Sequence, residues 1–148
     1  MRLSDVNPDC TLVLLDLFLT PENIPSLLEE NAPDYVVDCI DNVAAKTALA
    51  VTCSERNIPL IASMGTGNKL DPTRLRIDDI SKTSVCPLAR VMRKRLRDAG
   101  IRKQLVLWSD ELPITPGDGE RTPASISFVP PAAGIIIAGR VVRDLADI

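Results

Sequence analysis

The fold of this chain is decided by the stretch Tyr35-Val36-Val37-Asp38-Cys39-Ile40-Asp41-Asn42. Its apolar run predicts a buried strand from Asp34 to Ile40, and the run ends in acids and an amide. A helical pattern follows at once, from Val43 to Glu55. Ligands of open parallel α/β sheets bind beyond the carboxyl ends of the strands. We therefore expect these polar side chains to lie at a ligand site.

Length and composition indicate a cytoplasmic protein with one domain, residues 1–148. The chain is 45% hydrophobic but only 3% aromatic, so aliphatic side chains must fill the core. A net charge of −3 argues against a protein that coats nucleic acid through bulk charge. No apolar run reaches the roughly 18 residues of a membrane span, and the first residues show no apolar signal core.

The cysteines do not predict a metal site. Cys10, Cys39, Cys53 and Cys86 form no Cys-x-x-Cys pair, and we expect neither structural zinc nor disulfides. Cys39 is expected in a core strand, where it would be inert. The chain has no histidine, which removes the usual general base. Chemistry here must use carboxylates, lysines, a thiol or a cation such as magnesium.

The first half of the chain alternates strands and helices. A helix is predicted from Thr20, with Pro21 at its first position, to about Glu30. It lies between two of the predicted strands, which are Thr11–Leu19, Asp34–Ile40 and Ile58–Ser63. This order predicts parallel pairing through right-handed crossovers.

The second half departs from that alternation. We expect a loop at Gly65–Asn68, a turn at Asp71-Pro72-Thr73 and a turn-rich loop at Pro113–Pro123. Strands are predicted at Arg74–Ile80, Leu105–Trp108 and Ser125–Val129, and helices at Pro87–Ala99 and Pro131–Ala146. In the helix at Pro87–Ala99, one face is shared by Leu88, Val91, Met92 and Leu96. The helix at Pro131–Ala146 is expected to be buried on nearly all sides around Ile135–Ile137. The fold class is thus α/β, with a mostly parallel, Rossmann-like sheet flanked by helices and an antiparallel C-terminal extension.

Several phrases together resemble one family. They are Asp38-Cys39-Ile40-Asp41-Asn42, Ile58-Pro59-Leu60, Asp71-Pro72-Thr73, Lys82-Thr83-Ser84-Val85-Cys86-Pro87-Leu88-Ala89 and Ser127-Phe128-Val129-Pro130-Pro131-Ala132-Ala133-Gly134. In this order they resemble the ubiquitin-activating-type (ThiF) superfamily of adenylating enzymes. The Asp-Pro-Thr turn and the Lys-Thr phrase are most similar to the tRNA threonylcarbamoyladenosine dehydratases.

The resemblance implies an ATP-dependent activation of a carboxylate. In the dehydratase branch this is the threonyl carboxyl group of threonylcarbamoyladenosine in tRNA, which then closes to a cyclic product. One alternative is a non-enzymatic binding module that keeps the fold. Another is a fragment of a sulfur-carrier adenylyltransferase with a sulfur-transfer partner protein, although that branch often carries paired Cys-x-x-Cys ligands, which are absent here.

The resemblance also implies site residues. Asp41 matches the carboxylate of the ATP–magnesium site, and magnesium suits one or two carboxylates plus phosphate oxygens. Asn42 would bind nucleotide or cap the next helix, and capping is an alternative for Asp41 as well. Lys46 would reach phosphate or pair with Asp41 or Asp38. The buried Asp38 would contact ligand or hold a neighbouring loop.

Two further groups of residues invite functional interpretations. Cys86 precedes Pro87 at a helix start, where a thiol pKa falls, so transfer to this cysteine is one hypothesis and a buried, idle thiol the other. Between Arg90 and Lys103 the chain is strongly basic. We predict RNA-phosphate contacts, or alternatively a solvated helix face, for Arg90, Arg93, Lys94 and Arg97.

The chain departs from the family at its start. Residues 1–34 contain no glycine, whereas family members begin with a strand and a glycine-rich phosphate loop. We therefore interpret the chain as the C-terminal two thirds of an adenylating-type domain. Its expected partners are tRNA and either a second copy of itself, as a homodimer, or a complementing N-terminal chain. Alone it is expected to bind ATP weakly or not at all, because the loop amides are missing.

Overall fold

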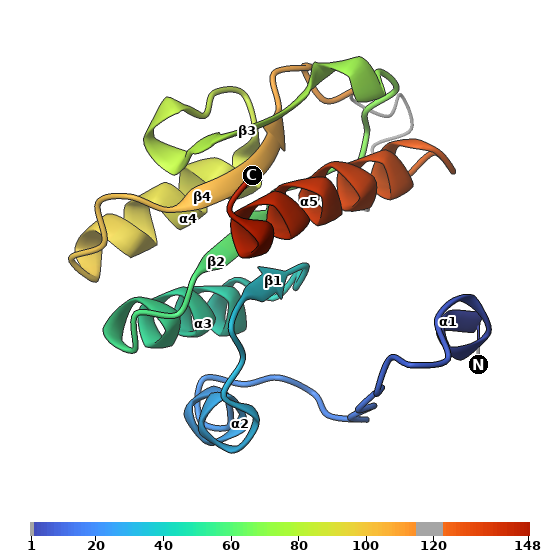
Figure 1. Ribbon diagram of the computed structural model, residues 1–148. Coiled ribbons are helices and arrows are strands. Elements are labelled where there is room, and N and C mark those ends of the chain that lie inside the picture. Colours follow the sequence, from blue (N-terminus) through green and yellow to red (C-terminus); the bar gives the residue numbers. More distant parts are fainter. Residues whose placement is uncertain (1, 115–122) are drawn as a thin grey trace.

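The computed structural model describes residues 2–114 and 123–148. Within these residues the strands form one sheet in the order β1-β2-β4-β3 (Figure 1). Its strands are β1 (Val36–Asp38), β2 (Leu60–Ser63), β3 (Leu75–Asp79) and β4 (Leu105–Ser109). β1, β2 and β4 run parallel, and β3 pairs antiparallel with β4. The α/β class with a mostly parallel sheet is therefore confirmed.

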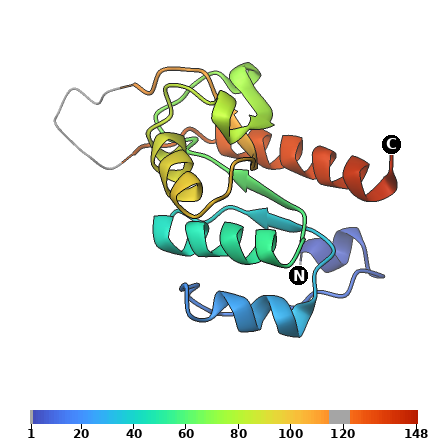
Figure 2. The ribbon, with the colours of Figure 1, turned by 90° about the vertical axis from the view of Figure 1, so that its left-hand side faces the viewer.

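Helices cover both faces of this sheet. The α-helices of the described residues are α1 (Arg2–Val6), α2 (Ile24–Asn31), α3 (Val43–Glu55), α4 (Pro87–Asp98) and α5 (Val129–Ala146), of which α1 lies apart from the sheet (Figure 1). Figures 1 and 2 show α3 and α4 on one face and α5 on the other. The larger core cluster joins α2, α3 and α4 to Val106, and the smaller joins α5 to Leu107. Neighbouring residues of β4 thus point to opposite faces, as the two-residue period of a strand requires.

Helix α3 spans the residues that its sequence pattern predicts. Asn42 has extended backbone, and its Oδ1 accepts hydrogen bonds from the N–H groups of Ala44 at 2.9 Å and Ala45 at 3.0 Å. These bonds satisfy two of the free amides at the start of the helix. The sequence-based start at Val43 is therefore confirmed, with a local cause.

Helix α2 begins later than predicted, at Ile24 rather than near Thr20. The Thr20 N–H donates to Asn23 Oδ1 at 2.9 Å, and Asn23 Nδ2 donates to the Phe18 carbonyl at 2.9 Å. Asn23 therefore closes a turn ahead of the helix. The predicted end was accurate to within one residue, since the helix ends at Asn31.

The predicted strand at Thr11–Leu19 is wrong. The segment has no regular secondary structure, and Leu14 and Phe18 are 82% and 75% exposed. A strand needs a neighbour to complete its backbone hydrogen bonds, and none of the described residues pairs with this segment. The outer edge of β1 is likewise unpaired among the described residues.

The predicted strand at Ser125–Val129 is also wrong. Helix α5 already begins at Val129, because Pro130 and Pro131 occupy its first turn, where proline is well tolerated. Near-complete burial of this helix is not observed either, since Ile135 is 74% exposed. Val91 of α4 is also exposed, so only part of its predicted apolar face is buried. The loop predicted at Pro113–Pro123 lies largely outside the described residues.

Across residues 2–114 and 123–148, no helix combines the length and the apolar character that crossing a membrane requires.

The exposure of the N-terminal segment leads to a stability prediction. Replacement of Phe18 by Ser should change the free energy of unfolding by less than about 0.5 kcal/mol, because this side chain loses little buried contact. Met92→Ala, at a position 1% exposed, should cost about 2–5 kcal/mol. Urea unfolding of both variants measures the difference. A cost above about 1 kcal/mol for Phe18→Ser would show that the segment packs in solution.

Candidate functional site

A cleft of about 770 Å³ opens at the carboxyl ends of β1 and β2. One wall is the turn between β1 and α3, and another is the loop that follows β2. Residues from the chain around Pro123 and from the first half of α5 close it. The lining residues are Cys39, Ile40, Asp41, Ser63, Met64, Gly65, Thr66, Gly67, Leu88, Pro123, Ser125, Pro130, Ala133, Gly134 and Ile137. This is the edge at which parallel α/β sheets bind ligands.

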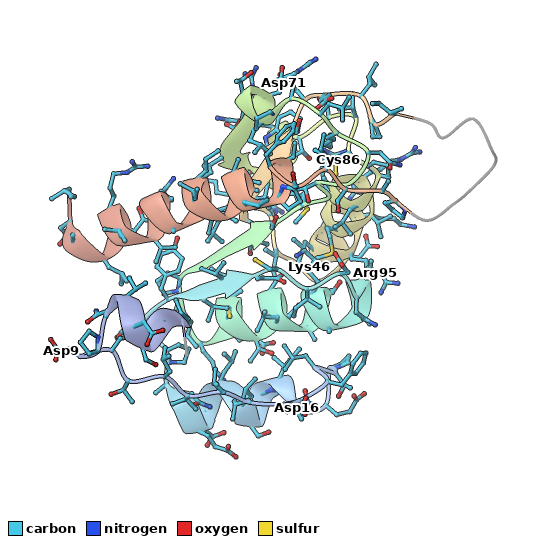
Figure 3. All side chains as sticks on the ribbon, turned by 90° about the vertical axis from the view of Figure 1, so that its right-hand side faces the viewer. Asp9, Asp16, Lys46, Asp71, Cys86 and Arg95 are labelled. Carbon is cyan, nitrogen blue, oxygen red and sulfur yellow. The ribbon has the colours of Figure 1, made fainter. Side chains whose placement is uncertain are left out.

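A buried ion pair supports the wall between β1 and α3. Asp38 Oδ2 lies 3.0 Å from Lys46 Nζ, and both side chains are fully buried. Ile40 bonds to both partners: its N–H donates to Asp38 Oδ1 at 2.9 Å, and its carbonyl accepts from Lys46 Nζ at 3.2 Å. Lys46 lies between α3 and the sheet in Figure 3. Of the alternatives for Lys46, pairing with Asp38 is therefore the one observed.

The same burial affects the acid of the pair. It raises the pKa of Asp38, and the nearby Lys46 charge and the Ile40 N–H oppose that rise. Asp38 Oδ2 is buried, and the Lys46 ammonium group 3.0 Å away is its partner among the described residues. Losing the lysine would leave a buried carboxylate without a counter-charge, which is costly.

Asp41 and Asn42 take different positions. The Asn42 side chain accepts hydrogen bonds from two N–H groups at the start of α3, so the prediction that it caps this helix is confirmed. Asp41 is exposed and lines the cleft. Within the described ranges no three acidic or thiol side chains gather into a metal site. One carboxylate nevertheless fits magnesium whose other ligands are phosphate oxygens and water.

The two cysteines near the cleft differ from each other. Cys39 is exposed and lines the cleft, so its predicted place inside a core strand is wrong. Partial burial raises the pKa of its thiol. Cys86, labelled in Figure 3, is 3% exposed at the start of α4. Its sulfur would lie 3.8 Å from a Cβ added at Gly65. A large substrate cannot reach its sulfur in this arrangement.

The loop after β2 contributes more than the sequence indicated. A Cβ at Gly67 would lie 2.8 Å from Pro123 Cβ, so only glycine fits there without a shift. The next residue, Asn68, exchanges hydrogen bonds with Ala124: its N–H donates at 2.7 Å, and its Oδ1 accepts at 2.8 Å. The loop therefore positions the Pro123 wall of the cleft. The two glycines directly after a strand were the available signal, since glycine there often marks a close approach.

The predicted basic face of α4 separates into two parts. The Arg93 guanidinium donates to the carbonyls of Ile80 and Thr83 and holds that turn. Arg90, Lys94 and Arg97 are exposed, and none of them forms an ion pair with a described residue.

Residues 1–147 match the family model described as the ThiF family. The chain belongs to the ThiF family. It is 41% identical to the tRNA threonylcarbamoyladenosine dehydratase of Bacillus subtilis (strain 168), with 97% of this chain and 63% of that protein covered.

Two crystal structures support the same placement in the ThiF family. The E. coli tRNA N6-threonylcarbamoyladenosine dehydratase TcdA in complex with AMP matches with a TM-score of 0.88 and 27% identity, over 99% of this chain and 61% of that one. Its complex with ATP matches with a TM-score of 0.75 and 28% identity, over 96% and 63%. The chain thus spans less than two thirds of the length of these relatives.

The buried pair predicts a strong, pH-dependent coupling. Lys46→Met should destabilise the protein by about 3–5 kcal/mol at neutral pH, because it leaves Asp38 charged and buried. The double variant Asp38→Asn/Lys46→Met should recover much of that loss. Urea unfolding of the unchanged protein, the two single variants and the double variant measures the coupling free energy between the two side chains.

The sign of the pH effect follows from Asp38. With its folded pKa raised above the unfolded value of about 4, the Lys46→Met variant should be most stable in acid and lose stability as the pH rises through that folded pKa. The coupling would be contradicted if the stability losses of the two single variants simply added up in the double variant and did not vary with pH.

Proposed function

We propose that this chain takes part in the ATP-dependent activation of the threonyl carboxylate of threonylcarbamoyladenosine in tRNA, followed by ring closure. The observation that carries the proposal is the cleft at the carboxyl edge of β1 and β2, with Asp41 on its wall, in a ThiF-family chain. AMP and ATP were bound in crystals of the related E. coli dehydratase, which supports a nucleotide as the ligand.

The chemistry defines the task of the cleft. A carboxylate oxygen attacks the α-phosphorus of ATP, the bond to pyrophosphate breaks, and an acyl adenylate results. An internal nucleophile of the modified base then attacks the activated carbonyl carbon, and AMP leaves. Asp41 would hold magnesium against the phosphate oxygens, and the cation supplies the positive charge that lets one anion attack another.

The lining of the cleft leaves part of that task unfilled. Among the described residues, this lining contains neither lysine nor arginine. Its acidic residue is Asp41. Positive charge for a triphosphate must therefore come from magnesium and from groups outside this lining. We propose that additional polypeptide of the adenylating type adds strands at the unpaired edge of β1 and covers the exposed Leu14 and Phe18. A homodimer also stays a prediction, for which the exposed Ile135, Val142 and Leu145 of α5 offer apolar surface.

A non-catalytic binding module is the second candidate. The observation that favours it is the internal use of three expected site residues: Asp38 and Lys46 pair with each other, and Asn42 caps α3. Sulfur-carrier activation is a third interpretation, without an observation of its own in the described residues.

Deletion of the gene in its own organism tests the function. Cyclic threonylcarbamoyladenosine should disappear from total tRNA, with the uncyclised nucleoside accumulating, as measured by mass spectrometry of nucleosides. An allele carrying Asp41→Asn should restore less than about a tenth of the cyclic product, since loss of one charge-stabilising group typically costs 10²-fold or more in rate.

Asp34→Asn is the matched control. Asp34 is also an exposed aspartate, but it precedes β1 and lies at the opposite end of that strand from the cleft. Its allele should restore the cyclic nucleoside fully. Persistence of the cyclic product after deletion, with no second gene of this family present, would favour the binding module instead.

A further inference from the structure

The basic residues of this chain fall into two classes. Many of those outside α4 bind acids within the fold: Arg74 and Arg76 contact Asp110, and Arg140 contacts Asp144. The exposed cations of α4 and of the turn that follows it form no ion pair within the described residues. These are Arg90, Lys94, Arg95, Arg97, Arg102 and Lys103. An acidic protein thus keeps a concentrated set of positive charges without ion pairs on α4 and in the segment that follows it.

Three of these cations, Arg90, Lys94 and Arg95, border a groove between α3 and α4. Its volume is about 610 Å³, and it is lined by Thr47 of α3 and by Arg90, Val91, Lys94, Arg95 and Asp98 of α4. Figure 2 shows the two helices next to each other, and Figure 3 places Arg95 at the outer surface beside them. Leu88, one turn before Val91 on α4, lines the cleft. The groove therefore starts one helical turn from the candidate site.

We infer that this groove, which we call the α3–α4 groove, binds the phosphate backbone of an RNA substrate. The inference rests on the proposed function, because it places the backbone along α4 while the modified nucleoside enters the cleft. Arg90 and Lys94 are one helical turn apart, and Arg97 is nearly one turn further, so cations recur roughly every 4.5–6 Å along the axis. Such a row suits successive phosphates.

The composition of the groove favours RNA backbone over other occupants. Among the described residues Val91 is its one apolar residue, too little surface for a hydrophobic partner or a membrane. No aromatic side chain of the part of the chain that the structure describes lines it, so these residues offer bases nothing to stack on. Recognition here is electrostatic and independent of sequence, which leaves selection of the nucleoside to the cleft.

Salt-dependent RNA binding by the full chain tests this inference. A fluorescent RNA stem-loop of anticodon-arm size, with unmodified adenosine and no ATP, is titrated by anisotropy over a series of KCl concentrations. For the Lys94→Ala/Arg95→Ala variant we expect roughly tenfold weaker binding and a slope of log K against log [salt] that is reduced by about 1.4–1.8, or 0.7–0.9 per lost phosphate contact.

Arg143→Ala is the matched control. Arg143 is exposed on α5, on the other face of the sheet, and also lacks an ion pair among the described residues. It should bind RNA like the unchanged protein, and circular dichroism melts should show that all variants fold.

Three results would overturn the inference: no salt-dependent RNA binding by the unchanged protein, an equal loss in Arg143→Ala, or polyglutamate binding as tightly as RNA, which would indicate an acidic protein partner. Any of them would leave the nucleoside analysis after gene deletion unaffected, because that measurement reports the reaction rather than this groove.

Discussion

The arrangement of the candidate site depends on the buried ion pair between Asp38 and Lys46. The acid ends β1 and the lysine lies in α3, so their contact fixes the strand end against the helix. Ile40 is bonded to both, which leaves the intervening turn little freedom. Two buried charges are expensive to bring out of water, and their geometry must be good for the fold to tolerate them. The position of Asp41 on the cleft wall follows from this constraint.

The same pair explains why the cleft carries so little positive charge. A lysine at the start of a helix beside a ligand site could have faced phosphate, but here its ammonium group neutralises an acid inside the protein. Asn42 is similarly used, since its amide oxygen takes two helix N–H groups that otherwise favour anions. The described cleft is thus a shaped, mainly neutral surface with one exposed carboxylate.

Local signals in the sequence predicted local structure well. Helix α3 was found with both ends, because Asn42 and the helical spacing act within a few residues. Thr11–Leu19 has equally strong strand character, but a strand forms only with a neighbour, and pairing is non-local. For Lys46 the sequence left three partners open, namely phosphate, Asp41 and Asp38, since spacing shows what the side chain can reach but not which contact burial will favour. Its location in the fold decided between them.

If the chain acts as proposed, the distribution of charge separates two binding problems that both involve phosphate. Exposed cations on α4 lie outside the cleft, where they attract a polyanion through long-range, salt-sensitive forces. Inside the cleft, Asp41 would repel a bare triphosphate and favours one that arrives with a divalent cation. Monovalent salt should therefore weaken the proposed RNA contact more than the proposed nucleotide contact, and chelation of magnesium should do the reverse. An RNA-modifying enzyme that placed its lysines inside the cleft would lose this separation, because the RNA backbone and the nucleotide would then compete for the same cations.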